Sequence, residues 1–298
     1  MSEILPIALA AYPILLSGVA LAWLLRVPYL SRLNWLVRLS ASGSIITFAF
    51  MTGPWAFTSY YLRYVVLGLF AIAAVFSYFR ARRNSHRFSA SDCRIAIPPI
   101  LVLLLFGVLD ALAIRSYYPS EETTELVFPL GSGTYYVLQG GTSTITNPFH
   151  ALGDSKLAMD IVKLNSLGNR AQGISPAGLS AYEVFGEKLY SPCQGTVFKV
   201  RDGLPDNPPG HPDTEHPEGN YVVLKCAEAD VFMAHLKSGS IKVALGDVVA
   251  VGQQLAEIGN SGNSSEPHLH IDARKDDVEK GLRFSGRLLS INSVIKRQ

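Results

Sequence analysis

The sequence predicts an N-terminal α-helical membrane domain of about four spans, residues 1–118, followed by a C-terminal all-β domain. The first observation is charge: residues 1–118 contain ten arginines, no lysine and three acidic residues, whereas the rest has 16 basic and 21 acidic residues. The second is composition, because only 17% of the residues are charged and 48% are hydrophobic, against about 25% charged in ordinary globular proteins. These features exclude a single soluble domain, a disordered chain and a nucleic-acid-binding protein with a basic face.

Four apolar runs account for the membrane domain. About 20 apolar residues cross a bilayer, and prolines such as Pro6 and Pro13 are tolerated in lipid. No basic residue precedes the first run, so it does not read as a signal peptide. The second run is the least apolar, being rich in Ser, Thr and Gly, and the third includes Arg63, which we expect to snorkel to the interface. The predicted spans are 4–25, 39–57, 60–79 and 95–114.

Arginine placement predicts the orientation of these spans. Arg26, Arg32 and Arg38 lie between spans one and two, and five further arginines lie between spans three and four. Short cytoplasmic loops collect basic residues, so the C-terminal domain is expected outside. The chain then reads as a multi-pass protein of the cytoplasmic (inner) membrane, with the lipid bilayer as a partner. Asp110, near the outer end of span four, is either an interfacial residue with access to water or a functional intramembrane carboxylate.

Short strand-like segments with turn residues between them fill the chain after a polar linker at 119–126. Valine, phenylalanine and tyrosine dominate these segments, a pattern typical of a β-sandwich or barrel. Two stretches differ: 163–190 is rich in Gly and Ser with room for a short helix, and 202–218, with five prolines, is expected to be an irregular loop. The expected strands lie at 126–128, 134–138, 157–162, 195–200, 221–224, 231–235, 248–249, 254–258 and 268–271.

Histidines gather in this second half. In His268-Leu269-His270 the two imidazoles share one face of a strand, since residues i and i+2 point the same way. His235 ends an apolar strand, where a hydrogen-bonded core histidine is the simpler interpretation. Asp160 lies inside the apolar segment 157–162, and burying its carboxylate requires a cationic partner. Either a bound Zn²⁺ or a neighbouring lysine would supply the positive charge.

Together these motifs resemble the lysostaphin-type zinc endopeptidases, also called LytM or duplicated-hybrid-motif peptidases. The matching pieces occur in the order Ala234-His235-Leu236, Gly246-Asp247-x-Val-x-x-Gly252, Gly259-Asn-Ser-Gly-Asn263 and Pro267-His-Leu-His270. The resemblance covers about residues 127–275 and implies the antiparallel sheets of the duplicated-hybrid-motif type. It also implies an extracytoplasmic zinc peptidase domain over 127–298.

The resemblance implies a role for each histidine of the motifs. His270 would be a zinc ligand, and His235 and His268 would be catalytic histidines that do not bind the metal. The other two ligands should come from an upstream His-x-x-x-Asp motif, from which this chain departs. His150 and Asp154 have the literal spacing, but Asp160 has the apolar strand setting of the acidic ligand. We favour His150 and Asp160 as ligands, with the residues between them looping out.

The function that the resemblance implies is hydrolysis of peptide bonds by a metal-activated water, with cell-wall peptidoglycan cross-links as the substrate. A metal-deficient module that regulates another wall hydrolase, or a membrane protease that processes a protein substrate, are the alternatives. His211 and His216 match no motif and are expected to be solvent-exposed loop residues, unless their loop rims the substrate cleft. Cys193 and Cys226 form either a disulfide, as an oxidising compartment allows, or two free thiols.

Overall fold

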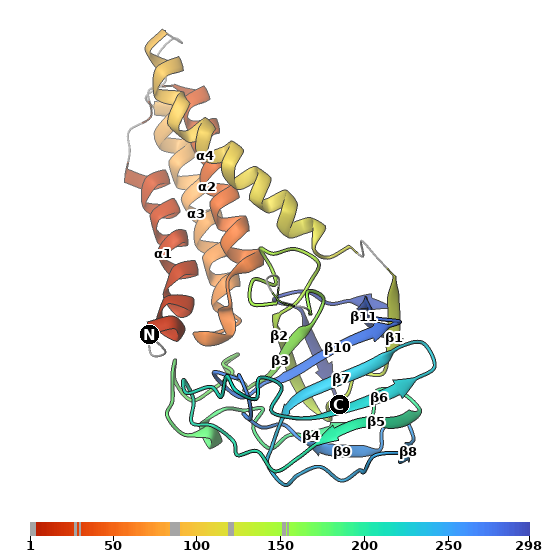
Figure 1. The fold of residues 1–298 in the computed structure, drawn as a ribbon. Coiled ribbons are helices and arrows are strands. Elements are labelled where there is room, and N and C mark those ends of the chain that lie inside the picture. Colours follow the sequence, from red (N-terminus) through yellow and green to blue (C-terminus); the bar gives the residue numbers. More distant parts are fainter. Residues whose placement is uncertain are drawn as a thin grey trace.

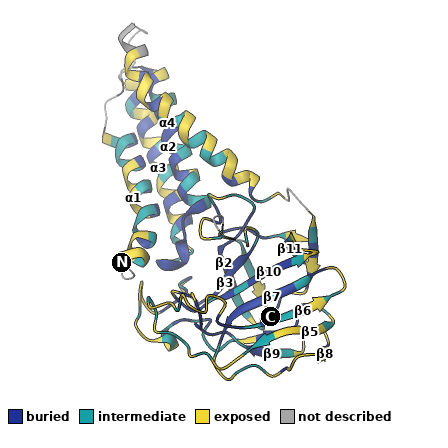
Figure 2. Cartoon of the chain, in the orientation of Figure 1, coloured by how far each residue is buried: buried dark blue, intermediate teal, exposed yellow. Residues whose placement is uncertain are grey.

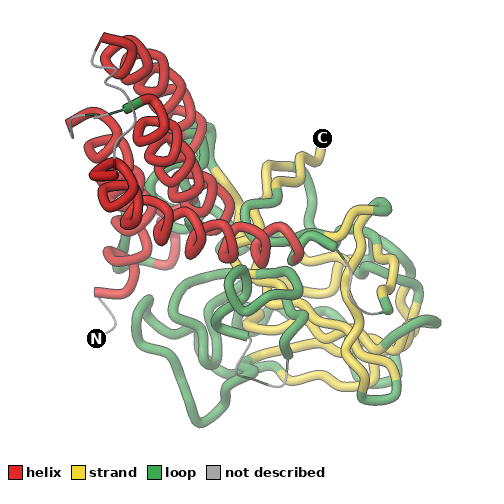
Figure 3. Tube along the Cα trace, turned by 90° about the horizontal axis from the view of Figure 1, so that it is seen from above, coloured by secondary structure: helices red, strands yellow, loops and turns green. Residues whose placement is uncertain are grey.

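The computed structural model describes residues 4–26, 29, 31–83, 90–118, 122–150, 153 and 155–298. Four N-terminal helices rise from one side of a C-terminal β-sheet domain, so the predicted fold class is confirmed (Figure 1). Seen from above, the helices gather beside the strands, and long loops fill the space between them (Figure 3).

The four helices are long and apolar enough to cross a membrane. The second is the least apolar, with a mean hydropathy of 1.2 in its best window against 1.9 to 2.4 in the others. A short 3₁₀ helix, η1 (Trp55–Phe57), follows the second helix. The helices are α1 (Ile4–Arg26), α2 (Arg32–Thr52), α3 (Leu62–Arg83) and α4 (Ala90–Arg115).

The second helix begins and ends earlier than the predicted span 39–57. Its start is set by Ser31, whose hydroxyl accepts a hydrogen bond from the Asn34 amide at 3.2 Å, a typical N-cap. Its end is set by Pro54, since the residue before a proline is disfavoured in the α conformation. Arg38 therefore lies within the helix, where its guanidinium donates to Asn34 and is only 3% exposed.

Two charged side chains of the helices make contacts with other helical residues. Arg63, the second residue of α3, is buried, with its guanidinium 3.6 Å from the centre of the Phe50 ring. Asp110 accepts a hydrogen bond from the Ser44 hydroxyl at 2.6 Å, which ties α4 to α2.

The β domain contains one 11-stranded sheet and one two-stranded sheet in the described part of the chain. The longest path through the large sheet runs β13-β2-β3-β10-β7-β6-β5-β8, with β11 also pairing with β10. All its pairs are antiparallel except β1 with β11. The strands are β1 (Thr123–Leu126), β2 (Gly133–Gln139), β3 (Met159–Leu164), β4 (Lys188–Tyr190), β5 (Gly195–Arg201), β6 (Asn220–Cys226), β7 (Asp230–Leu236), β8 (Val248–Val249), β9 (Gln254–Glu257), β10 (Leu269–Lys275), β11 (Val278–Phe284), β12 (Arg287–Leu288) and β13 (Val294–Arg297).

Several strands go beyond the sequence-based prediction. β1 occupies the end of the predicted linker 119–126, and strands β4, β11, β12 and β13 were not expected. The stretch 163–190 is mostly irregular, with one 3₁₀ turn, η2 (Leu179–Ala181), and 202–218 contains neither helix nor strand. Cys193 and Cys226 are joined in a disulfide, which decides between the two alternatives for these thiols.

The helices and the β domain share a hydrophobic core. Ala10 of α1 and Phe57 of η1 pack with Tyr136, Leu138 and Val162 of strands β2 and β3. The buried residues are continuous from the base of the helices into the sheet, whereas the outer faces of the helices are exposed (Figure 2). The helical part is therefore packed onto the β domain and is not a separate tether.

Candidate metal centre

The pairing of β3 with β10 builds the centre of the site. In this antiparallel register His270 lies directly opposite Asp160, and side chains so paired on one face of a sheet are neighbours. The Asp160 Oδ1 and His270 Nδ1 atoms are 3.2 Å apart. The other ring nitrogen of His270, Nε2, lies 3.3 Å from Oδ2 of Asp272, which follows two residues later on the same face of β10.

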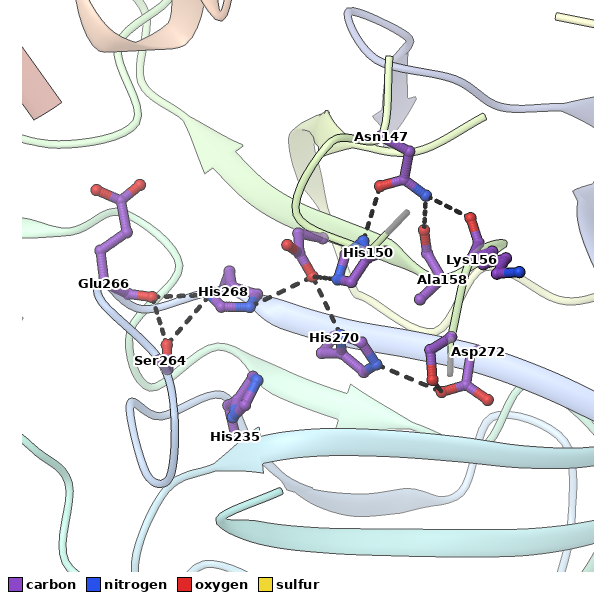
Figure 4. Close-up of polar contacts among 12 residues, drawn as sticks. Asn147, His150, Lys156, Ala158, His235, Ser264, Glu266, His268, His270 and Asp272 are labelled. Atoms are coloured by element: carbon purple, nitrogen blue, oxygen red, sulfur yellow. Dashed lines mark hydrogen bonds and ion pairs between the residues drawn. The ribbon is translucent and has the colours of Figure 1, made fainter. Parts of the chain in front are cut away.

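His150 reaches the site from the segment before β3. Its Nε2 atom lies 3.3 Å from Asp160 Oδ1, and its Nδ1–H donates to the Asn147 side-chain oxygen at 2.7 Å (Figure 4). The Asn147 amide nitrogen in turn donates to the carbonyls of Lys156 and Ala158, both at 2.9 Å. This asparagine bridges the two ends of the segment that joins His150 to β3, which is how the longer spacing is accommodated.

Asp154, the alternative acidic ligand, lies outside the described residues. The predicted pair of His150 and Asp160 is brought together across a nine-residue gap. That these two residues bind a metal stays a prediction.

His268 lies beside Asp160, and His235 lies beside His268; these two histidines complete the cluster. The His268 Nε2 atom is 3.3 Å from Asp160 Oδ1, and its Nδ1–H donates to the Glu266 carbonyl at 2.8 Å. The Nδ1–H of His235 donates to the Ser261 carbonyl at 2.9 Å, and the two rings are 4.9 Å apart. Because both Nδ1–H groups donate to backbone carbonyls, the Nε2 atom of His235 carries the lone pair, and the Nε2 atom of His268 faces Asp160.

The backbone of His235 is unusual. Its φ is +61°, a left-handed conformation that is uncommon for residues other than glycine. The pairing of β6 with β7 shifts register between Asn220 and Val222, opposite this residue. Such irregularities re-aim side chains next to active sites, and here the shift accompanies the turning of His235 toward His268.

The charges of Asp160 and the neighbouring imidazoles influence one another strongly. Burial favours the neutral form of Asp160, but the imidazoles of His150 and His268 outweigh it and hold the pKa of this carboxyl well below its usual range. Burial likewise disfavours the charged form of His268, yet Asp160 raises the pKa of this imidazole. The Asp160 carboxylate is therefore an anion that attracts positive charge.

The two remaining imidazoles respond in opposite ways. Burial opposes protonation of His270, but hydrogen bonds to Asp160 and Asp272 raise its pKa to about 9. Burial, followed by repulsion from His268 and His270, lowers the pKa of His235 well below its usual value. His235 is thus a neutral base, and His270 carries a proton that a cation at the same position would replace.

The donor atoms fit a zinc ion. One oxygen and two nitrogens, from Asp160, His150 and His270, lie within 4.8 Å of one another, and catalytic zinc sites take three such protein ligands. His235, His268 and His270 form a second close set. The first set agrees better with the hydrogen bonds, because Asn147 and Asp272 occupy the outer nitrogens of its two histidines, as partners of metal-binding histidines do.

A buried ion pair supports the loop that carries His268. Arg170 donates to Glu266 through Nε at 2.6 Å and Nη2 at 2.5 Å, and the side chains are 1% and 9% exposed. The Arg170 guanidinium also lies 3.5 Å from the centre of the Phe57 ring of η1. Glu266 thus links the base of the helices to the carbonyl that orients His268.

Sequence patterns could have identified only some of these supporting residues. Asp272 follows His270 by two residues, so strand alternation alone places it on the same face. Arg170 and Asn147 lie in irregular segments without a motif, and no sequence signal indicated them. His211 and His216 are exposed as expected, and His216 binds Asp213 at 2.9 Å.

A cleft of about 600 Å³ opens beside the histidines. Its walls include Gly210, Pro212 and Pro217, so the loop that carries His211 and His216 does rim the cleft. Leu5, Pro6 and Leu9 of α1 and Pro54 and Phe57 of the α2–α3 turn also line it.

Comparison with known proteins finds a family profile and several solved structures that resemble this chain. Residues 177–281 match the sequence profile of peptidase family M23. A zinc-containing peptidase from Vibrio cholerae shares 20% identity over 51% of this chain and 37% of its own, with a TM-score of 0.33. The catalytic domain of the antimicrobial peptidase lysostaphin from Staphylococcus simulans shares 20% identity over 36% of this chain and 80% of its own, with a TM-score of 0.20.

These structural scores are low, and this chain spans only about a third of the Vibrio cholerae protein. The similarity to this family therefore rests on the profile match. The matched residues include His235, His268 and His270 but begin after His150 and Asp160. The motifs that resemble lysostaphin-type peptidases and the matched residues are in the same part of the chain. Residues 177–281 of this protein are accordingly similar to peptidase family M23.

Proposed function

We propose that this protein is a membrane-anchored zinc endopeptidase whose catalytic domain faces the outside of the cytoplasmic membrane. The single observation that carries the proposal is the convergence of His150, Asp160 and His270 on one point, with His235 and His268 beside it. All five residues of the expected site are present and close together, which favours a catalyst over a metal-deficient regulatory module.

The chemistry follows from the donor set. Zinc, when bound by His150, Asp160 and His270, lowers the pKa of a coordinated water to about 7 and polarises the scissile carbonyl. Peptide hydrolysis also needs a proton acceptor for the water and a proton donor for the leaving amine. The Nε2 atoms of His235 and His268 supply these functions, because their Nδ1–H groups are held by Ser261 and Glu266.

The arrangement of the helices supports the proposed orientation. The start of α1, the α2–α3 turn and the end of α4 all lie beside the β domain, and the arginine-rich helix ends point away from it (Figure 1). Basic residues favour the cytoplasmic side, so the β domain would lie outside. There we propose peptidoglycan peptide cross-links as its substrate, the substrate class that the resemblance to lysostaphin-type peptidases implies.

The test measures metal content and activity on the full chain, purified in detergent. The intact chain is required because α1 and η1 contribute to the core of the β domain. We expect one zinc per chain and release of peptides from purified peptidoglycan. His268→Ala should keep the zinc and lose turnover, whereas His270→Ala or Asp160→Ala should lose the zinc.

The opposite pattern would overturn the assignment of roles: zinc lost with His268→Ala and kept with His270→Ala. Absence of zinc from the unaltered protein after growth in zinc would overturn the proposed chemistry. Zinc binding without cleavage of any peptide would reject the proposed peptidase activity.

A further inference from the structure

The cleft beside the metal centre has a wall made of membrane helix. Leu5 and Leu9 are one turn apart on α1, and both face the cavity that also contains His150, Asp160 and His268. On the neighbouring side, Phe57 of the α2–α3 turn closes the cleft and stacks on Arg170. The substrate site is therefore bounded partly by the helical domain.

The length of α1 sets the height of this wall relative to a bilayer. The helix has 23 residues, which at 1.5 Å per residue is about 35 Å. The hydrocarbon core of a bilayer is about 30 Å thick, so a spanning α1 extends past it by about one turn in total. Leu5, in the first turn, then lies at the level of the outer headgroups.

The β domain is held at this height by many contacts. The Arg170 amide donates to the Ala56 carbonyl at 3.0 Å, and the Tyr60 amide donates to the Gly168 carbonyl at 2.8 Å. From the C-terminal end, the Asn292 side chain donates to the Met51 carbonyl at 2.8 Å. With the shared hydrophobic core, these bonds keep the catalytic cleft at the helix ends instead of letting it reach away from the membrane.

We propose that the substrate is a cell-wall peptide that is still attached to a lipid anchor in the outer leaflet, and that it is cleaved at the bilayer surface. This inference rests on the proposed function: if the substrate is a wall peptide and the cleft stays at headgroup level, the accessible peptides are those that a lipid holds there. Leu5 and Leu9 then contact the part of the substrate next to its anchor.

The test uses the full chain in phosphatidylcholine vesicles and one stem-type peptide in three membrane-bound forms. Each form carries an acyl chain, joined to the peptide directly or through rigid spacers of six or twelve prolines, which extend about 19 and 37 Å. All three have the same density on the vesicle, so local concentration is matched. The same peptide without an acyl chain, and purified peptidoglycan, serve as the soluble and the wall substrates.

We expect the directly acylated peptide to be cleaved at least tenfold faster than the twelve-proline form. Leu5→Gln should raise the KM for the directly acylated peptide several-fold more than the KM for the soluble peptide.

Equal rates for all three spacers, or faster cleavage of the long form, would overturn the inference while leaving the peptidase function intact. So would cleavage of a membrane-spanning polypeptide next to its helix in preference to the acylated peptide. Loss of cleavage of every substrate by a zinc-loaded protein would instead reject the proposed function itself.

Discussion

Removing one partner of the buried Arg170–Glu266 pair should destabilise the protein strongly. In Arg170→Met the side chain keeps much of its length but loses both hydrogen bonds to Glu266, leaving a carboxylate whose side chain is 9% exposed. An uncompensated buried charge of this kind costs about 3–5 kcal/mol. At about 2–4 °C per kcal/mol for a domain of this size, the midpoint of thermal unfolding should fall by about 6–20 °C.

The assay is thermal unfolding in detergent, with a matched control on an exposed pair. Arg201 and Glu218 form an ion pair whose side chains are 40% and 50% exposed, and such pairs contribute about 0–1 kcal/mol. Arg201→Met should therefore change the midpoint by at most a few degrees. The double variant Arg170→Met/Glu266→Gln, which removes the buried charge as well, should be more stable than Arg170→Met alone.

Equal shifts for Arg170→Met and Arg201→Met would refute this reasoning, since they would mean that burial of the first pair has no energetic consequence. At temperatures where it stays folded, Arg170→Met should also have a lower kcat with its zinc retained. The reason is that Glu266 holds His268, which is not expected to be a ligand.

Three other predictions follow from contacts around the site. Asn147→Ala should weaken zinc binding about 10- to 100-fold, measured by competition with a chelator, because it frees the outer nitrogen of His150; unchanged affinity would exclude His150 as a ligand. Replacing Cys193 and Cys226 together by serine opens a link across 33 residues and should cost about 3–4 kcal/mol; an unchanged unfolding midpoint relative to the unaltered, oxidised protein would contradict it. Gly168→Ala should lower stability, because Gly168 has a φ of +79° and its Cβ would lie 3.0 Å from the Tyr60 amide nitrogen; a neutral result would mean that the contact between helices and β domain is loose.

Much of the architecture could be predicted because it depends on patterns along the chain. Uncharged runs bounded by arginines indicated the four helices, although Arg38 was taken as an end of span two and lies within α2. A charge ends an apolar run in a sequence, but in the structure Asn34 and the Tyr29 ring cover this guanidinium. Of the C-terminal strands that were missed, β12 and β13 are short, and β11 contains three charged residues and a glycine.

The residues of the site likewise divide into those that the sequence indicated and those that only the structure revealed. His268 and His270 are two residues apart, and strand alternation alone brings them to one face. Asp160 could be singled out because a carboxylate in an apolar strand needs a positive partner. Arg170, Glu266 and Asn147 act through contacts between segments up to about a hundred residues apart, and no local pattern encodes such contacts.

Local periodicity and charge along this chain determined the apolar helices, most of the strands, the histidine pair and the motifs that resemble those of M23 peptidases. Only the tertiary structure decided that His150 joins Asp160 over a longer spacing, that two cysteines meet, and that α1 and the α2–α3 turn form a wall of the cleft beside the histidines. The physical reason is that hydropathy and side-chain alternation act between neighbours in sequence. Packing of an apolar helix against a distant strand depends instead on shape and hydrogen bonds that exist only once the whole chain has folded.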